Sequence, residues 1–187
     1  YDCAFYQSSV KNVVLPEGLE KIGNSAFWSN KALESINFPS TLLDVGDNAF
    51  EYCSVLDGIA LPDGITHIGV SAFYNTKYYD DRNNWTDYGN VLINNGWLLQ
   101  MYTDSLVSTT LTIAEGIKGL ADNVFTYTNI NQFTAISLPK SLKYVGESAL
   151  QSLYLATDIY YASSKDDFEK IEIGNRNTVF DTATLHY

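Results

Sequence analysis

Three prolines set a regular period in the first part of this chain. They lie 23 residues apart, at Pro16, Pro39 and Pro62. A phenylalanine follows each of them after 11 residues, at Phe27, Phe50 and Phe73. A repeat of this length is typical of a solenoid, in which each copy forms one turn and buries its apolar face only by stacking on its neighbours. The sequence therefore predicts a stack of similar turns.

One repeat predicts the parts of one turn. Ile36 and Phe38 are two residues apart, so both side chains point to the same side of an extended strand. Pro39 ends that strand because it has no N–H to donate to a neighbouring strand. A short second leg then returns to the core, and a compact helical or 3₁₀ segment places Phe50 inside the coil.

A glycine stands four residues before the phenylalanine position in most copies. It is found at Gly23, Gly46, Gly69 and Gly146. In one further copy the same position holds Ala121. An alanine forced to adopt a positive φ would cost roughly 1 kcal/mol or more. We therefore favour close packing as the reason for the glycine, with a required positive φ as the alternative.

The full repeat reads L-x-x-I-x-[LF]-P-x-x-[LI]-x-x-[IV]-G-x-x-A-F-x-x-[CNT]. It resembles the BspA-type leucine-rich repeat of bacterial surface and secreted proteins. The clearest copies run from Leu33 to Cys53, from Leu56 to Thr76 and from Phe133 to Leu150. A copy between Ser108 and Thr128 departs from the pattern, with alanine in the proline and glycine positions.

This resemblance covers nearly the whole chain and implies a fold class. It implies a β-rich α/β solenoid, a right-handed leucine-rich repeat coil of about six rungs of ~23 residues with short parallel strands and short helical or 3₁₀ turns. We expect one elongated domain over the 187 residues. Its parts are N-terminal rungs over 1–76, an inserted hairpin region over 77–105, C-terminal rungs over 106–162 and a C-terminal cap over 163–187.

The inserted region contains a hairpin signal. Two apolar runs, Val91–Ile93 and Trp97–Leu99, flank the turn sequence Asn94-Asn95-Gly96. Strands separated by such a turn are typical of a β-hairpin. A degenerate extra rung is the alternative interpretation.

The last segment has the features of a cap. Ser163 or Ser164 is placed to cap a short helix, and the acidic residues after them favour its N-terminus. The alternation of Leu185 and Tyr187 predicts a closing strand. A solenoid needs such a polar-faced cap to remain soluble.

The charge balance narrows the class of partner. The chain has a formal net charge of −11 and a pI of about 4.4. Nucleic acids and anionic membrane surfaces bind clustered Lys and Arg, so this charge argues against both. No run of about 20 apolar residues that could span a membrane is present. Because Tyr1 opens inside a repeat, we expect any signal peptide or anchor of this extracellular or cell-surface protein to lie upstream of the fragment.

The two cysteines stand at different positions of their repeats. Cys3 precedes its phenylalanine, whereas Cys53 follows Phe50. Two rungs of about 4.8 Å each place them roughly 10 Å apart along the axis, which is too far for a disulfide. We expect two free, half-buried thiols.

Strand residues that alternate with the core positions are expected on the concave face of the coil. They are Asn12, Val14, Ser35, Asn37, Gly58, Ala60, Thr110, Thr112, Ala135, Ser137, Asp158 and Tyr160. Partners usually anchor through aromatic and charged side chains, which this face lacks until Asp158 and Tyr160. Either the polar members of this set bind a ligand, or the face is plain and the binding surface lies elsewhere.

The insert is rich in aromatic and acidic residues. Its composition suits stacking on sugar faces, because aromatic rings are mixed with Asp and Asn, and the rings are Tyr78, Tyr79, Trp85, Tyr88, Trp97 and Tyr102. It equally suits a hairpin that packs its own rings, whereas the acidic spacing does not match a calcium loop. We expect Trp85 to be packed and at least one of Tyr78, Tyr79 and Tyr88 to be exposed.

Nothing in the sequence indicates catalysis, a cofactor or a metal. The two histidines are His67, expected on an exposed return leg, and His186. Phosphate loops, zinc motifs and nucleophile elbows are missing from the sequence. The leading hypothesis is a non-catalytic recognition module of a bacterial surface or secreted protein that binds protein partners of a host or neighbouring cell. The alternatives are a glycan-binding module that uses the insert aromatics, and a spacer that presents another domain.

Overall fold

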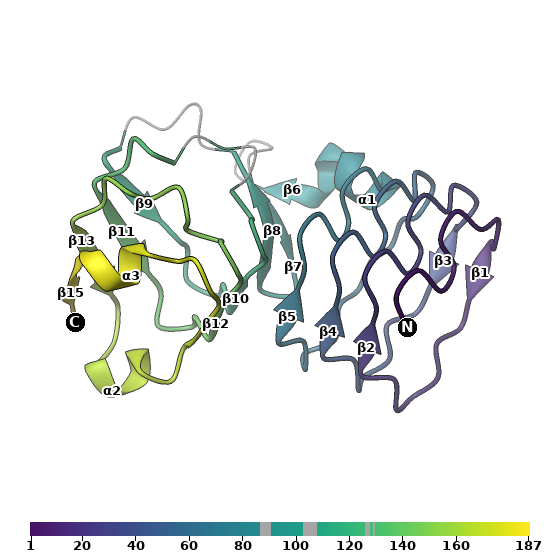
Figure 1. Cartoon of the computed structure of the whole chain (residues 1–187), viewed down its shortest axis with the longest axis horizontal. Helices are drawn as coiled ribbons and strands as arrows, with labels where there is room; N and C mark the ends of the chain where they lie inside the picture. The colour runs from purple at the N-terminus through teal and green to yellow at the C-terminus, as the bar shows by residue number, and fades with distance from the viewer. Residues whose placement is uncertain (87–90, 103–107, 126–127, 129) are drawn as a thin grey trace. The chain divides into compact units, whose positions relative to one another are not determined.

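The computed structural model describes residues 1–86, 91–102, 108–125, 128 and 130–187 (Figure 1). The chain forms two compact units, Tyr1–Asn95 and Gly96–Tyr187. Both are stacks of short turns whose strands pair mostly in parallel. The expected solenoid is therefore confirmed.

In the first unit two repeats contribute a strand to each of two sheets, and the next repeat adds a strand to one of them. One sheet pairs β1 (Asn12–Val13) with β3 (Ser35–Ile36) in parallel. The other sheet has the order β2 (Lys21–Ile22), β4 (Asp44–Val45) and β5 (His67–Ile68), also parallel. The paired residues are 23 apart in sequence, so the proline period gives the strand register.

A stack of phenylalanine rings fills the centre of this unit. Phe50 is fully buried, and its ring centroid lies 5.2 Å from that of Phe27 and 5.5 Å from that of Phe73. The rings are almost parallel, at 5° and 4°. Phe5 extends the stack on the other side of Phe27, at 5.0 Å. The predicted aromatic stack is confirmed.

Close packing explains the glycine position. None of the four repeat glycines has a positive φ. A Cβ atom at Gly69 would lie 2.5 Å from the backbone nitrogen of Asp47 in the preceding rung, and one at Gly146 would lie 2.6 Å from that of Asp122. Because the backbones of neighbouring rungs meet here, glycine leaves the space that this contact needs.

The segment after the glycine differs from the prediction, because it is a series of turns and not a helix. Ser25, Asn48 and Ser71 have φ of 52°, 53° and 53°. These left-handed residues direct N–H groups along the stack, so Phe27 N donates to Ala49 O and Phe50 N to Ala72 O, both at 2.8 Å. A helix would pair its N–H groups internally and lose these bonds between rungs.

The inserted region begins with elements that the sequence did not predict. Helix α1 (Lys77–Asp80) is capped by Thr76, whose hydroxyl accepts from Tyr79 N at 3.1 Å, and a 3₁₀ turn, η1 (Arg82–Asn84), follows. Strand β6 (Trp85–Thr86) then pairs antiparallel with β7 (Val91–Asn94).

The turn that follows β7 has the predicted form. Asn95 and Gly96 have φ of 43° and 76°, as a two-residue hairpin turn requires, and β8 (Trp97–Met101) comes next. Strand β8 also pairs in parallel with β10 (Gly119–Leu120), with Trp97 opposite Gly119. The insert therefore contains the predicted hairpin turn. The strand after it, β8, pairs in parallel as the strands of the rungs do, which is what the degenerate-rung alternative expected.

The second unit contains two parallel sheets. One has the order β14 (Glu172–Ile173), β12 (Tyr144–Val145), β10 and β8. The other has the order β15 (Thr184–His186), β13 (Asp158–Tyr161), β11 (Ala135–Leu138) and β9 (Thr110–Thr112). The predicted closing strand is β15, which pairs with β13.

The C-terminal cap contains the predicted helix and one more. Helix α2 (Lys165–Phe168) is capped by Ser164, whose hydroxyl accepts from Asp167 N at 3.2 Å. Helix α3 (Val179–Thr182) was not predicted. None of the helices in the described residues is long and apolar enough to span a membrane.

Both cysteines are free, as predicted, but neither is half-buried. Cys3 is exposed in the first turn. Cys53 is fully buried and donates to Phe27 O at 3.0 Å, and burial raises the pKa of its thiol to about 12. The difference arises because the position three residues after the phenylalanine points into the core, while the position two residues before it does not.

Candidate functional site

Most of the predicted strand residues of the second unit share the outer face of the sheet formed by β9, β11, β13 and β15. One row across this sheet is Thr112, Ser137, Tyr160 and His186, and the next begins with Thr110 and contains Asp158. The residues between these rows, such as Leu111 and Ile159, are buried. The alternation of the strands therefore brings the predicted residues of this unit together on one surface.

The most distinctive group on this face consists of Asp158, Tyr160 and His186. The rings of Tyr160 and His186 are stacked, with centroids 4.8 Å apart and planes at 16°. Nε2 of His186 lies 2.7 Å from Oδ1 of Asp158. Thr157 donates to the other carboxylate oxygen at 2.7 Å. The imidazole is thus fixed between a carboxylate and a phenol ring.

This group is exposed and charged at neutral pH. Tyr160 is 47% exposed. Hydrogen bonds from His186 and Thr157 hold the pKa of Asp158 below its usual value, so this carboxylate is ionised. The group therefore offers a partner an aromatic surface beside a negative charge, a combination that suits protein recognition.

The same geometry does not form a catalytic triad. Among the described residues, no hydroxyl or thiol is hydrogen-bonded to His186, and the hydroxyl of Thr157 donates to Asp158. A triad requires the imidazole to accept a proton from a nucleophile. In the described part of the chain, no group of three or more His, Cys, Asp or Glu side chains could hold a metal ion.

His186 was not among the predicted site residues. The signal that could have found it was the alternation in the final strand, which places Leu185 inward and its neighbour outward. Its position opposite Tyr160 follows from the register of β13 and β15 and could not be read from either strand alone.

The predicted residues of the first unit form hydrogen bonds mainly with neighbouring rungs of the same chain. Ser35 Oγ donates to Asn12 Oδ1 at 2.7 Å. The side-chain amide of Asn37 accepts from Leu15 N at 2.6 Å and donates to Leu15 O at 2.9 Å. These side chains are exposed, but their hydrogen bonds join neighbouring rungs, and they present neither charge nor an aromatic ring.

At least one of Tyr78, Tyr79 and Tyr88 was predicted to be exposed, and neither of the two that the structure describes is the exposed ring. Tyr78 and Tyr79 are only 8% and 9% exposed. Tyr78 Oη accepts from Asn94 Nδ2 at 2.8 Å, and the ring of Tyr79 contacts Trp85 at 5.3 Å. Each ring is buried because α1 lies against neighbouring aromatic and strand residues. Tyr88 lies outside the described residues.

Trp85 is packed, as predicted. It is 6% exposed, and its indole Nε1 donates to Tyr79 O at 2.7 Å. Arg82 lies over its ring, with Cζ 4.7 Å from the centroid. Tyr78, Tyr79 and Trp85 therefore stabilise the insert and are not available as stacking surfaces for a sugar.

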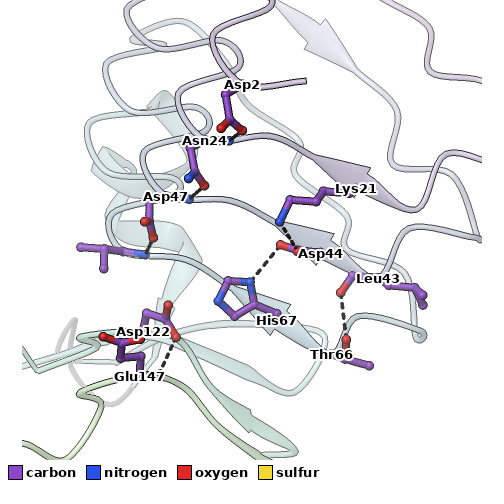
Figure 2. Close-up of polar contacts among 11 residues, drawn as sticks. Asp2, Lys21, Asn24, Leu43, Asp44, Asp47, Thr66, His67, Asp122 and Glu147 are labelled. Atoms are coloured by element: carbon purple, nitrogen blue, oxygen red, sulfur yellow. Dashed lines mark hydrogen bonds and ion pairs between the residues drawn. The ribbon is translucent and has the colours of Figure 1, made fainter. Parts of the chain in front are cut away.

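A row of polar contacts joins the strands of the other sheet in the first unit (Figure 2). Asp44 Oδ2 lies 2.6 Å from Lys21 Nζ, and Asp44 Oδ1 lies 2.9 Å from His67 Nδ1. Burial alone would raise the pKa of Asp44, but hydrogen bonds from His67 and Lys21 outweigh it and lower that pKa. The expected exposure of His67 is partly confirmed, since its side chain is 41% exposed.

A second row in Figure 2 runs beside the glycines. Asp2, Asn24 and Asp47 each accept, through Oδ1, the backbone N–H of the residue one rung further on, at 2.8, 3.0 and 2.9 Å. In the second unit Asp122 accepts from Glu147 N in the same way, at 2.7 Å. These carboxylates and this amide satisfy backbone donors of the neighbouring rung, so both rows are structural.

The repeat pattern can now be compared with known proteins. Residues 1–84 and 100–178 match the family described as the BspA type leucine-rich repeat region, in six copies. The chain belongs to the BspA-type leucine-rich repeat family. Among curated proteins, nothing matches the chain.

Solved structures of leucine-rich repeat proteins resemble this BspA-type chain. A leucine-rich repeat protein from Bacteroides ovatus matches with a TM-score of 0.44 and 18% identity, over 95% of this chain and 56% of that protein. A leucine-rich cell surface protein from Faecalibacterium prausnitzii matches with a TM-score of 0.41 and 23% identity, over 89% of this chain and 36% of that protein. This BspA-type chain therefore spans about half or less of the length of either protein.

Proposed function

We propose that this chain is a non-catalytic recognition module that binds protein partners through the outer face of the sheet formed by β9, β11, β13 and β15. The observation that carries the proposal is the exposed stack of Tyr160 on His186, fixed by Asp158. Tyrosine is enriched among the residues that dominate protein interfaces, because it offers a large rigid contact surface with a polar end.

The surroundings of the stack support a protein partner. Thr112 and Ser137 continue the row across the sheet, so the stack stands beside small polar side chains. A partner with a basic or hydrogen-bonding side chain would meet the ionised Asp158. Such a partner would have to be present outside the cell, because membership of the BspA-type family supports a surface or secreted location, and we propose proteins of a host or neighbouring cell.

The insert gives less support to the glycan alternative. Its stacking surfaces would have to be exposed, whereas Tyr78, Tyr79 and Trp85 are buried. Protein binding at the strand face is therefore the function that the geometry favours.

Binding to an array of host and bacterial surface proteins tests the proposal. The wild-type chain and Tyr160→Ala are compared, with Tyr154→Ala as the matched control, since Tyr154 is also exposed in this unit but lies off the sheet. We expect Tyr160→Ala to weaken binding of a captured partner about 30-fold, as for a residue that costs about 2 kcal/mol, and Tyr154→Ala to leave it unchanged. Equal affinity of wild type and Tyr160→Ala would show that this face is not the binding surface.

A further inference from the structure

A pocket of about 290 Å³ lies in the second unit, away from the strand face. Its lining residues come from the end of β13, from α2 and the residues after it, and from β12 with the segment that leads into it. Three lysines line it, Lys140, Lys143 and Lys170, together with the rings of Tyr144 and Tyr161. Three of the eleven basic residues of this acidic chain thus gather around one small cavity.

Among the residues that line the pocket, three lysines face two carboxylates, and the carboxylate of Glu115 acts on Tyr161 from beside them. Asp167 and Lys170 neutralise each other, because Nζ lies 2.8 Å from Oδ1 and the other carboxylate oxygen accepts from Ser163 at 2.8 Å. Hydrogen bonds from Lys170 and the serines lower the pKa of Asp167 to about 2. The ammonium groups of Lys140 and Lys143 make no ion pair or hydrogen bond with any residue that the structure describes, and Glu172 is the remaining acidic group of the lining.

The wall of the pocket contains the buried ring of Tyr161, whose hydroxyl reaches solvent. Tyr161 is 4% exposed, and its ring contacts Phe168 with centroids 5.5 Å apart. Its hydroxyl makes no hydrogen bond to a residue that the structure describes and is not fully buried, so it can reach a ligand in the pocket. Burial, reinforced by the charge of Asp167, raises the pKa of Tyr161, so the hydroxyl stays protonated and can donate.

An aromatic ring forms another wall. Tyr144 is stacked on the buried Trp97, with centroids 5.8 Å apart and planes at 12°. This stack holds the ring of Tyr144 in place at the pocket. The volume is close to the lower limit of ordinary small-molecule sites, so the pocket suits a ligand of about one sugar ring.

We propose that this pocket binds an acidic sugar of the hexuronate type. Lys140 and Lys143 would hold the carboxylate, Tyr161 would donate to a ring or hydroxyl oxygen, and Tyr144 would contact the sugar ring. The net charge of −11 disfavours long polyanions, since the rest of the surface would repel them. A single small anion avoids most of this repulsion.

Isothermal titration and NMR titration of the whole chain test the proposal. The probes are glucuronate, glucose and acetate, which separate the acidic sugar from its neutral ring and from its carboxylate alone. We expect glucuronate to bind with a millimolar Kd and glucose and acetate to bind about tenfold more weakly. Shifts of the Tyr144 and Tyr161 rings would place the ligand in the pocket.

Single substitutions distinguish binding in this pocket from general attraction between opposite charges. Lys143→Gln and Lys140→Gln should each weaken glucuronate binding about tenfold, and Tyr161→Phe should weaken it several-fold while the melting temperature stays near that of wild type. The matched control is Lys165→Gln, because Lys165 pairs with Glu169 on α2 and does not line the pocket. The proposal is overturned by a lack of glucuronate binding, by equal affinities for glucuronate and acetate or glucose, or by an equal loss in Lys165→Gln.

Discussion

Lys21 and Asp44 are 23 residues apart in sequence and directly opposite each other on neighbouring strands, with Nζ and Oδ2 only 2.6 Å apart. The same carboxylate also contacts His67 on the next strand. One repeat period therefore connects the charges of three successive rungs. This relationship is local to nearest neighbours, as the stability of a repeat protein is expected to be.

Asp44→Asn tests how much the contacts of Asp44 with Lys21 and His67 contribute to stability. We expect it to lower the free energy of unfolding by about 1 kcal/mol, because the groups are partly exposed and solvent screens them. The folded-state pKa of Asp44 is lowered, so its contribution is present above the ordinary Asp pKa of about 4 and is lost as the pH falls below it. Urea unfolding at neutral pH and below pH 4 measures this.

The matched control for that change is Glu34→Gln. Glu34 lies 3.8 Å from Lys11, and both side chains are largely exposed, so little loss is expected at any pH. If the difference in unfolding free energy between wild type and Asp44→Asn stayed the same at neutral pH and below pH 4, the lowered pKa of Asp44 would be contradicted.

Phe50→Ala should destabilise the first unit strongly. The ring is fully buried between two others, and removal of such a ring typically costs about 3–5 kcal/mol. Phe5→Ala is the control, because Phe5 belongs to the same stack but is 40% exposed, and we expect a smaller loss there. Equal losses in the two variants, measured by denaturant unfolding, would mean that burial does not determine the contribution of a ring to the stack.

Gly69→Ala and Gly64→Ala separate packing from conformational freedom. Neither glycine has a positive φ, but a Cβ atom at Gly69 would lie 2.5 Å from Asp47 N, whereas at Gly64 its nearest neighbour would be 3.6 Å away. We expect Gly69→Ala to cost about 1–3 kcal/mol by overpacking. Gly64→Ala should be neutral or slightly stabilising, by up to about 1 kcal/mol. Thermal melts that show the opposite order would refute the packing explanation.

The periodic part of the fold could be predicted from the sequence, and the reason is physical. Each rung contacts mainly its neighbours, so the spacing of Pro39 from Pro62 fixes the pairing of Asp44 with His67 without further information. The same logic predicts the buried ring of Phe50 and the tight position of Gly69. Ala121 in the glycine position of one copy already suggested close packing, and the backbone contacts of Gly69 show it.

The parts that could not be predicted depend on contacts that the period does not encode. The turns after the glycine are left-handed at Asn48 because hydrogen bonds to the next rung replace those of a helix. The burial of Tyr78 depends on Asn94, which is 16 residues away and outside any repeat. The stack of Tyr160 on His186 depends on the register of the closing strand.

Trp85→Ala should destabilise the inserted region of the first unit. The ring is buried, and its indole N–H satisfies Tyr79 O, so we expect a loss of about 3–5 kcal/mol for this region. Trp85→Phe keeps most of the apolar ring but leaves the carbonyl without this donor, which should cost about 1–3 kcal/mol. Hydrogen exchange of the amides in α1 and β7 measures both, since it reports on local opening. If Trp85→Ala left this exchange unchanged, the ring would not hold the insert together, and the aromatic residues of the insert would again be candidates for binding a sugar.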